Sequence, residues 1–372
     1  MRVQIVDPLA QTPPFDRSLS AALARAGADV ELLTSRFVHG PVAEPEGYDV
    51  DEGFYRRSSR LAGGSLARRA VGLAEHVPSM MRARRAGARA DVVHYQWLTL
   101  PGLDARLLPK GPAKVMTVHE LLQLGQGRGS VLAKAIDRMD SVVVLTEHGA
   151  GRLQEELRIP SDRISVIPHG AFDYLTRLPE EAPLLPELEG AEGPVILSFG
   201  LIRPYKGVDI LLRAFAELEA DTAELWIAGR PLGVDPAELH RLAEAAKGRV
   251  RFVTRFITDS ELPAIFRRAD VVALPYREAQ QSGVLYAALA FGKAIVASSV
   301  GGLQEVARAG QGETLRLVEP GSEADLAAAL AALLRDPAER ERLGAAAAAA
   351  AAGPYSWDAV AAQALELYRR LI

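Results

Sequence analysis

Short apolar, β-branched segments alternate with longer segments of helical periodicity along the chain, and this alternation constrains the fold more than any other feature. In the first half, the helix candidate Arg17–Ala26 is apolar at every third or fourth position. The strand candidates of this half are Val3–Val6, Val30–Thr34, Val92–His94, Lys114–Val118, Val142–Leu145 and Ile164–Ile167. Because strands that are apolar on both faces need cover on both sides, the pattern predicts a parallel sheet with helices on each face.

The same alternation restarts after residues 179–194, whose sequence PEEAPLLPELEGAEGP has no period and is typical of a linker. A terminal helix follows Ser356, a suitable N-cap. The sequence therefore predicts an α/β protein with two Rossmann-like, doubly wound parallel-sheet domains, residues 1–178 and 195–354, followed by a helical segment 355–372. Ligands of such sheets bind beyond the carboxyl ends of the strands, so we expect the two domains to face each other across a cleft.

Composition excludes several classes of protein. With 49% hydrophobic and 24% charged residues, the 372-residue chain has the balance of an ordinary globular protein. It contains no cysteine, which excludes disulfides, thiolate metal sites and cysteine nucleophiles and fits a reducing compartment. No uncharged apolar stretch is long enough to span a membrane, and the start MRVQIVDPLAQ is typical of a first strand rather than a signal peptide. We therefore expect a cytoplasmic protein.

The loop after the strand candidate Val195–Phe199 carries two cations, Arg203 and Lys206, just before a helix. Cations beside a helix N-terminus form an anion site, because the helix dipole and the free backbone donors favour negative charge there. Both side chains suit phosphate oxygens. A solvated loop whose basic residues have no function is the alternative.

Two more loops of the second half follow strand candidates. In residues 275–285 (PYREAQQSGVL), Ser282 and Gly283 stand at a helix start, where backbone amides can approach an anion closely. Glu278 lies about one turn earlier and is suited either to accept hydrogen bonds from sugar hydroxyls or to cap that helix. Residues 300–306 (VGGLQEV) contain a two-glycine turn. Three such loops on one sheet would converge on one crevice.

The order of these motifs resembles that of family-four glycosyltransferases of the GT-B fold. The resemblance rests on GLIRPYKG (200–207), LPYREAQQSGVLYAALAFGKAIVAS (274–298), VGGLQEV (300–306), VIPHG (166–170) and YSWDAVAAQALELYRRL (355–371). It implies sugar transfer from a nucleoside-diphosphate sugar with retention of anomeric configuration. It also implies no cofactor and no required metal, a donor held mainly by the second domain, and a terminal helix that returns to the N-terminal domain.

Through this resemblance, Lys206 matches the family lysine that contacts the donor diphosphate, and Glu278 matches a glutamate that meets the transferred sugar. The donor-binding residues that we expect are Gly200, Gln281, Ser282, Gly283, Val284 and Tyr286. The chain departs from the family at two points. Leu201 stands where an arginine is usual, and Arg203 could reach the same phosphates. Tyr286 falls where a second glutamate commonly holds the ribose, although a tyrosine hydroxyl can still hydrogen-bond.

In the first domain, the resemblance places His119, in MTVHE, beside the reacting sugar. A lone histidine at a strand end is otherwise more often structural. His94, in VHYQW, also ends a strand and is expected to shape the acceptor pocket. Asp16 is expected to cap the first helix, and Arg17 is a candidate contact for an acceptor phosphate. With no cysteine and scattered histidines, no metal site is predicted, and Asp49-Val50-Asp51 is expected to lie in a polar loop.

Residues 56–89 are strongly basic, with nine arginines and one acid, Glu75. Apolar residues are interleaved with the arginines, so the segment predicts a basic amphipathic helix that could lie on an anionic membrane surface. A solvated face, or one that docks an anionic partner, is the alternative. A nucleic-acid partner is not predicted, because the rest of the chain is acidic and carries no recognised binding motif.

The resulting hypothesis is a retaining, metal-independent glycosyltransferase with catalytic residues His119, Glu278, Lys206 and Arg203. The acceptor is a glycan, a lipid-linked sugar or a small molecule. Two rival hypotheses stay open at this point. One is a sugar-nucleotide epimerase or hydrolase of the same fold, and the other is a catalytically idle protein that binds nucleotide sugars.

Overall fold

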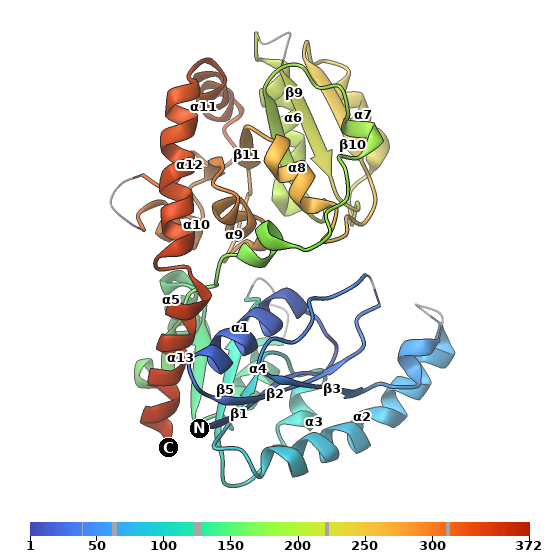
Figure 1. Cartoon of the computed structure of the whole chain (residues 1–372), viewed down its shortest axis with the longest axis vertical. Coiled ribbons are helices and arrows are strands. Elements are labelled where there is room, and N and C mark those ends of the chain that lie inside the picture. Colours follow the sequence, from blue (N-terminus) through green and yellow to red (C-terminus); the bar gives the residue numbers. More distant parts are fainter. Residues whose placement is uncertain (39, 62–64, 122–127, 220–222, 310–312) are drawn as a thin grey trace. The chain divides into compact units, whose positions relative to one another are not determined.

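A computed structural model describes residues 1–38, 40–61, 65–121, 128–219, 223–309 and 313–372 (Figure 1). The chain divides into two compact units. Unit 1 comprises Met1–Gly170 together with Trp357–Ile372, and unit 2 comprises Ala171–Ser356. Each unit is a parallel sheet covered by helices, which confirms the predicted fold class.

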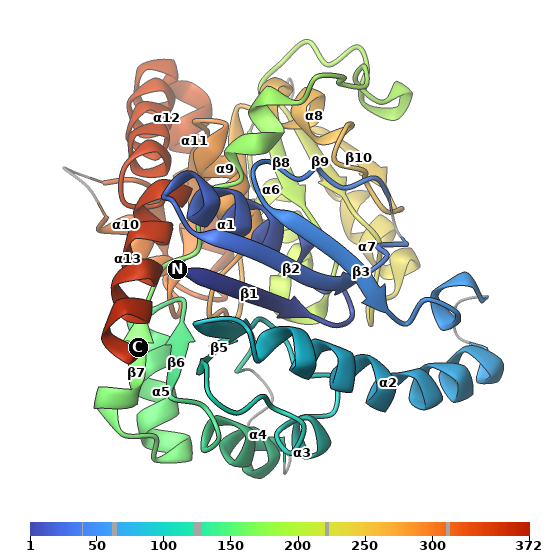
Figure 2. The same cartoon turned by 60° about the horizontal axis from the view of Figure 1, so that its bottom comes forward.

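The described residues of unit 1 form a seven-stranded parallel sheet in the order β3-β2-β1-β4-β5-β6-β7. Its strands are β1 (Arg2–Asp7), β2 (Asp29–Ser35), β3 (Asp49–Phe54), β4 (Val92–Tyr95), β5 (Ala113–Val118), β6 (Ser141–Val144) and β7 (Ile164–Val166). Its helices are α1 (Pro13–Arg25), α2 (Leu66–Gly87), α3 (Pro101–Asp104), α4 (Arg128–Ile136), α5 (Glu147–Leu157) and α13 (Trp357–Leu371). Helices α1 and α2 lie on opposite faces of this sheet (Figures 1 and 2).

Strand β3 corrects one expectation. Asp49 and Asp51, expected in a polar loop, belong to this strand, which pairs in parallel with β2 at the edge of the sheet. An edge strand tolerates acids because one side of it is open to water. Asp51 pairs there with Arg56 and Arg82, each at 3.4 Å.

Helix α13 belongs to unit 1 although it ends the chain. It packs against α1 (Figure 2). The Tyr368 hydroxyl of α13 lies 2.6 Å from His94 Nδ1 in β4, and the Trp357 ring lies edge-on to Phe15 of α1, with 5.1 Å between ring centroids. These contacts fix the fifteen-residue helix on unit 1.

The described residues of unit 2 form a six-stranded parallel sheet in the order β10-β9-β8-β11-β12-β13. Its strands are β8 (Val195–Phe199), β9 (Glu224–Ala228), β10 (Arg249–Val253), β11 (Val271–Leu274), β12 (Ala294–Ser298) and β13 (Arg316–Val318). Its helices are α6 (Val208–Ala216), α7 (Pro236–Ala243), α8 (Leu262–Arg268), α9 (Gly283–Ala290), α10 (Leu303–Ala307), α11 (Glu323–Arg335) and α12 (Pro337–Ala352). The strand order reverses at β8, so a ligand crevice is expected beyond the ends of β8 and β11.

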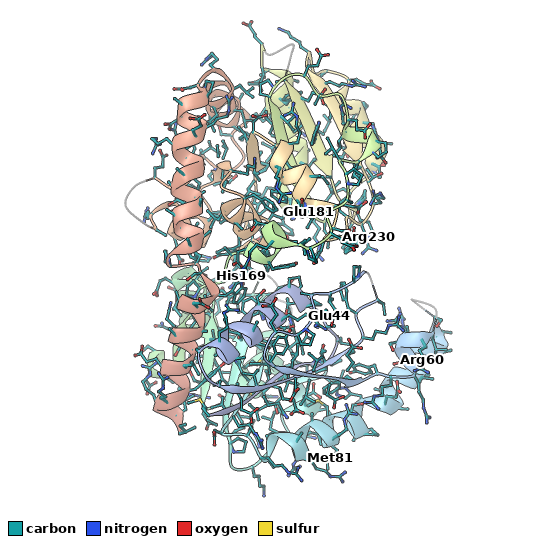
Figure 3. All side chains as sticks on the ribbon, viewed as in Figure 1. Glu44, Arg60, Met81, His169, Glu181 and Arg230 are labelled. Carbon is teal, nitrogen blue, oxygen red and sulfur yellow. The ribbon has the colours of Figure 1, made fainter. Side chains whose placement is uncertain are left out.

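Residues 179–194, expected to be a linker, are part of unit 2. Leu185 and Leu188 are buried in its core. The Gly193 carbonyl accepts a hydrogen bond from Arg268 at 2.7 Å, and Glu181 forms an ion pair with Arg267 (Figure 3). Residues 171–178 also join unit 2, so the structure divides the chain after Gly170. The Pro- and Glu-rich composition is typical of a linker, but the two buried leucines anchor this segment in unit 2.

Two helical glycines provide a test of the packing in this fold. A Cβ added at Gly344 of α12 would lie 2.4 Å from the Gly292 carbonyl oxygen, whereas one added at Gly151 of α5 would meet nothing within 4 Å. Gly151→Ala should therefore stabilise the protein by about 0.5–1 kcal/mol, the ordinary gain of alanine over glycine in a helix. Gly344→Ala should instead destabilise it by about 1–3 kcal/mol through overpacking. Calorimetric unfolding checks both values, and a stabilised Gly344→Ala variant would contradict the close approach of α12.

Candidate functional site

Gly200 follows β8 and allows two groups to approach the end of that strand. Its φ of +98° lies in the left-handed region that favours glycine. A Cβ at this position would lie 2.8 Å from Lys206 Nζ and 3.2 Å from Val284 Cγ2 in the first turn of α9. The ammonium group and the start of α9 therefore lie on the same side of the end of β8.

The Lys206 ammonium is held among polar and aromatic groups. Its Nζ lies 3.5 Å from the Phe199 carbonyl oxygen and 5.5 Å from the centroid of the Tyr276 ring. The Tyr276 hydroxyl is 3.0 Å from Ser282 Oγ, and Ser282 is the N-cap of α9, accepting a hydrogen bond from the Leu285 N–H. Lys206 is thus linked through Tyr276 to the N-terminus of a helix, where backbone donors favour anions.

The three loops predicted to converge are joined by hydrogen bonds. The Arg277 N–H donates to the Tyr205 carbonyl at 2.7 Å, and the Arg277 guanidinium forms two hydrogen bonds with Asp209, at 2.7 and 2.9 Å. These contacts tie the loop after β11 to the loop after β8. The Gly302 N–H donates to the Gln280 carbonyl at 3.2 Å, which ties in the loop after β12. The loops therefore form one continuous surface beyond the strand ends.

This surface carries positive charge that the described residues do not neutralise. Burial, and after it the charge of Arg203, lowers the pKa of the Lys206 ammonium to about 8. Within the described ranges, neither Lys206 nor Arg203 forms an ion pair. Arg203 Nε and Gln281 Oε1 are buried there without a hydrogen-bond partner. A ligand bound here would satisfy these groups if it accepted hydrogen bonds from the two cations and donated one to the Gln281 side-chain oxygen.

Glu278 and Tyr286, both expected at the donor, have different surroundings. Glu278 is exposed and lines a cavity of about 690 Å³ that Arg203 also lines. Tyr286 is only 1% exposed, and its ring packs edge-on against Tyr355. Burial raises the pKa of its hydroxyl well above the usual range. Tyr286 is thus a core residue of unit 2, and its side chain is not available to a ribose in this structure.

In unit 1, His119 lies in an aromatic cage beside a cavity of about 380 Å³. Its ring stacks on Trp97, with 5.1 Å between centroids, and lies edge-on to Phe15 at 4.9 Å. Its Nε2 is 2.9 Å from Gln96 Oε1. Burial lowers the pKa of His119 to about 3, with smaller effects from His169 and His94. The imidazole is therefore neutral at physiological pH and acts as a hydrogen-bonding group.

The other two residues expected on the acceptor side are engaged inside unit 1. His94 has both ring nitrogens satisfied, Nδ1 by Tyr368 at 2.6 Å and Nε2 by Thr117 Oγ1 at 2.7 Å. Arg17 is buried and donates to the Ala43 carbonyl at 2.6 Å. Each side chain bridges two elements of the unit, so the geometry favours structural roles for both. Because their hydrogen-bond partners are distant in the chain, these contacts could not be predicted from the sequence.

A carboxyl pair after β1 was missed by the sequence analysis. Thr12, rather than Asp16, is the N-cap residue of α1, and Asp16 lies one turn into the helix. Asp7 accepts the Gln11 N–H at 2.6 Å, and burial raises the pKa of Asp16 well above its usual range, with Asp7 adding to the effect. The Trp97 indole donates to Thr12 Oγ1 at 3.0 Å, so this pair orders a loop that supports the ring stacked on His119.

The basic segment forms α2, as predicted, with Arg60 just before the helix and Met81 toward its other end (Figure 3). His76 and Met80 are buried, whereas Leu66 is 81% and Leu73 66% exposed. Among the described residues no helix is long and apolar enough to cross a bilayer. Within the same ranges no group of three or more His, Cys, Asp or Glu side chains is arranged to hold a metal ion.

Comparison with known proteins agrees with this geometry. Residues 193–336 match the family described as glycosyl transferases group 1, and residues 17–171 match glycosyltransferase family 4. A D-inositol 3-phosphate glycosyltransferase of Arthrobacter sp. (strain FB24) is 30% identical, covering 96% of this chain and 89% of the relative. One from Kineococcus radiotolerans is 29% identical, covering 95% and 89%.

Solved structures resemble the whole chain. Sucrose-phosphate synthase from Thermosynechococcus elongatus superposes with a TM-score of 0.72 at 22% identity, covering 100% of this chain and 99% of the other. HepE of Anabaena, solved in complex with UDP-glucose, gives 0.72 at 18% identity and covers 100% of both chains. Two doubly wound sheets with such neighbours show the GT-B fold. The chain belongs to the group 1 glycosyltransferase family, and it is a transferase enzyme.

The buried ammonium of Lys206 has a consequence for stability. Because its pKa is lower in the folded protein than the ordinary 10.5, the unfolded chain binds more protons between about pH 8 and 10.5. Stability therefore rises with pH across that window. Lys206→Met should stabilise the ligand-free protein at pH 7 by about 1–3 kcal/mol, and the gain should shrink at pH 10. Calorimetric melting at both pH values checks this, with the exposed Lys247→Met as control. A destabilised Lys206→Met variant would show that Lys206 has a structural role.

Proposed function

We propose that the protein is a retaining, metal-independent glycosyltransferase that moves a sugar from a nucleoside-diphosphate sugar to a glycan, a lipid-linked acceptor or a small molecule. The single observation that carries the proposal is the half-buried ammonium of Lys206, which forms no ion pair among the described residues and lies beside Gly200 and the start of α9. The relatives named as D-inositol 3-phosphate glycosyltransferases support sugar transfer to a hydroxyl acceptor. HepE, solved with UDP-glucose, supports a nucleotide-sugar donor.

In this proposal, Lys206, Arg203 and the backbone amides at Ser282–Val284 bind the donor diphosphate. Charge grows on that diphosphate as the bond from the anomeric carbon to the phosphate oxygen breaks. Donors already in place stabilise this charge without reorganising, which is usually the largest contribution to catalysis. Metal independence rests on the same point, because the two side chains supply the positive charge that a cation would otherwise provide. Gly200 and Gln281 complete the donor site.

The remaining steps follow from the chemistry of a same-face displacement. The acceptor oxygen bonds to the anomeric carbon on the face that the diphosphate leaves, and the acceptor proton passes to a leaving phosphate oxygen. Configuration is thereby retained without an enzymic nucleophile. Glu278 accepts hydrogen bonds from donor sugar hydroxyls. His119, neutral because its pKa is about 3, hydrogen-bonds the sugar at its reacting face.

The donor proposal is tested by binding and by turnover. A thermal-shift screen against UDP-, GDP-, ADP- and dTDP-sugars should find one that raises the melting temperature, because a ligand that binds only the native state stabilises it. Lys206→Ala should lower turnover at saturating donor at least roughly tenfold, the loss of about 1.4 kcal/mol of transition-state stabilisation. The exposed Lys247→Ala is the matched control.

Three outcomes of this test would contradict the proposal. If no nucleotide sugar shifts the melting temperature, the donor assignment is wrong. Conversion of the donor without an acceptor would instead identify an epimerase or hydrolase. Tight binding without turnover for any acceptor would identify an idle binding protein, an outcome that the burial of Tyr286, in place of a second glutamate, would then explain.

We also propose that the protein is cytoplasmic and docks on anionic membranes through α2. Leu66, Leu73 and Val77 are exposed along this helix at helical spacing. Arg69 and Arg84, three residues after Leu66 and seven after Val77, lie on the same side of the helix, and no acid apart from Glu75 is in the helix. Glu75 accepts hydrogen bonds from the Arg57 and Ser58 N–H groups, each at 2.9 Å. An apolar stripe flanked by arginines binds the headgroup region of anionic bilayers.

Vesicle co-sedimentation tests the docking. The protein should bind vesicles that contain phosphatidylglycerol more strongly than pure phosphatidylcholine vesicles, and added salt should weaken the binding. Leu66→Asn combined with Val77→Asn should reduce binding several-fold, whereas Leu232→Asn, at an exposed leucine of unit 2, should not. Equal binding to both kinds of vesicle, or equal loss in the control, would refute docking through α2.

A further inference from the structure

Unit 1 contains a second cavity, larger than the one beside His119. It has a volume of about 770 Å³, within the usual range for small-molecule sites. Its walls come from the loops that follow β1, β2, β3 and β4, and from the first turns of α2. Loops beyond the carboxyl ends of neighbouring parallel strands are where such sheets bind ligands.

The charge of the cavity wall is of one sign. Arg36, Arg68 and Arg69 line it, and its described lining includes no Asp or Glu. Outside the cavity, Arg56 and Arg82 of the same segment both pair with Asp51. Across the described part of the chain, no ion pair is formed by the three arginines of the wall. Three cations around one hollow raise its affinity for an anion.

The polar groups of the wall suit phosphate in particular. Ser65 is the N-cap of α2 and accepts the Arg68 N–H at 3.1 Å, so the positive end of a 22-residue helix lies at the cavity. Ser58 and Ser59 also line this wall, but their hydroxyls donate to Glu75 and to the Arg56 carbonyl. The groups left for phosphate oxygens are therefore the arginine forks and the helix N-terminus, which are recurring partners of phosphate.

The opposite side of the cavity is apolar and open to solvent. Leu9, Val38, Leu73 and Leu100 all line it, and all are exposed by 37% or more. Covering apolar surface gains about 25 cal/mol per Å², so a ligand with an apolar portion would bind here more strongly than a purely polar one. Four such side chains on one cavity wall are not the scattered exposure that is ordinary for a protein surface.

Next to the cavity, three side chains are joined by hydrogen bonds. The Tyr55 hydroxyl lies 2.6 Å from His76 Nδ1, and His76 Nε2 lies 2.5 Å from Asp104 Oδ1. His76 and Asp104 are both buried. Tyr55 has a φ of +50°, a left-handed conformation that is costly for a bulky residue. Such strain persists where the surroundings impose it and is common at ligand sites.

From these observations we infer that this cavity binds a phosphorylated amphiphile, with its phosphate on Arg36, Arg68 and Arg69 and its apolar part on Leu9, Val38, Leu73 and Leu100. The identification of this ligand as the sugar acceptor rests on the proposed function, whereas the binding itself does not. The cavity adjoins α2, the helix proposed to dock on anionic lipid. A membrane-borne phosphorylated acceptor therefore meets the charged wall and the apolar wall of one site.

Calorimetric titration of the purified full chain with octyl phosphate, below its micellar concentration, tests the inference. Inorganic phosphate and glucose 6-phosphate supply the anion without the apolar tail, and octyl glucoside supplies the tail without the anion. Octyl phosphate should bind at least about tenfold more tightly than any of the three, equivalent to about 1.4 kcal/mol. Equal affinity for glucose 6-phosphate would identify a soluble phosphorylated ligand and refute the amphiphile. Equal affinity for octyl glucoside would refute the anion site.

Variants locate the binding. Arg68→Gln with Arg69→Gln should reduce octyl phosphate affinity to that of octyl glucoside, and Leu73→Ser should reduce it several-fold. Arg85→Gln changes an exposed arginine on the same helix outside the cavity and should have no effect. Far-ultraviolet circular dichroism confirms folding of each variant. Equal losses in the Arg85→Gln control would show non-specific attraction and overturn the site.

The failure of this inference and the failure of the proposed function are distinguishable. Lys206→Ala should weaken the thermal shift with the nucleotide sugar but leave octyl phosphate binding unchanged, because Lys206 lies in unit 2. If octyl phosphate binding is lost in Lys206→Ala but kept in the Arg68 and Arg69 double variant, the ligand occupies the donor site and the inference is wrong. Octyl phosphate binding without any nucleotide-sugar binding would leave the cavity assigned and the transferase proposal refuted.

Discussion

The close approach of the Lys206 ammonium to Gly200 is the constraint on which the donor side of this molecule depends. A partly desolvated charge without a counter-ion is unfavourable, and burial accordingly lowers the pKa of Lys206 to about 8. Within the loop, the ammonium has one long hydrogen bond, to the Phe199 carbonyl. It is held because Gly207 packs its Cα against the Pro275 carbonyl, where a Cβ would come within 2.0 Å, and because Arg277 bridges the loops through Asp209. The packing of unit 2 therefore stores the free energy that an anionic ligand releases.

The distribution of carboxylates makes the same point. Asp209 is the acid nearest in sequence to Lys206, but its oxygens are bonded to Arg277 and Arg213, and these partners lower its pKa despite its burial. Asp209 is thereby unavailable to Lys206. Structural arginines of the site have acidic partners, whereas Arg203 and Lys206 have none among the described residues. This division separates the cations that build the loops from those left for a ligand, and charge counting along the sequence could not make that separation.

The strands of both sheets were predictable because strands apolar on both faces leave few alternatives. The expected Val195–Phe199 is β8 with unchanged bounds. Strand β3 was missed because DVDEGF is polar, as only an edge strand can be. The candidate site residues also differ in how far their surroundings can be predicted from the local sequence. Lys206 and Ser282 lie in the loops to which the sequence assigns them, whereas the environments of His94 and Tyr286 depend on Tyr368 and Tyr355, far along the chain. Long-range partners of this kind leave no local signal.

Helix α2 has one face buried in unit 1 and another face exposed. Its His76 and Met80 are buried and anchor the helix in unit 1. The exposed face of the helix therefore does not contribute to the core. An exposed leucine such as Leu73 would be a liability on an ordinary helix, because it weakens solubility and contributes nothing to the core. The chain as a whole carries a net charge of −4, so a basic, apolar helix stands out against an acidic background. In the proposed docking, this contrast in charge favours an approach of anionic surfaces through α2. The cavity wall formed by Arg68 and Arg69 then lies at the point of approach.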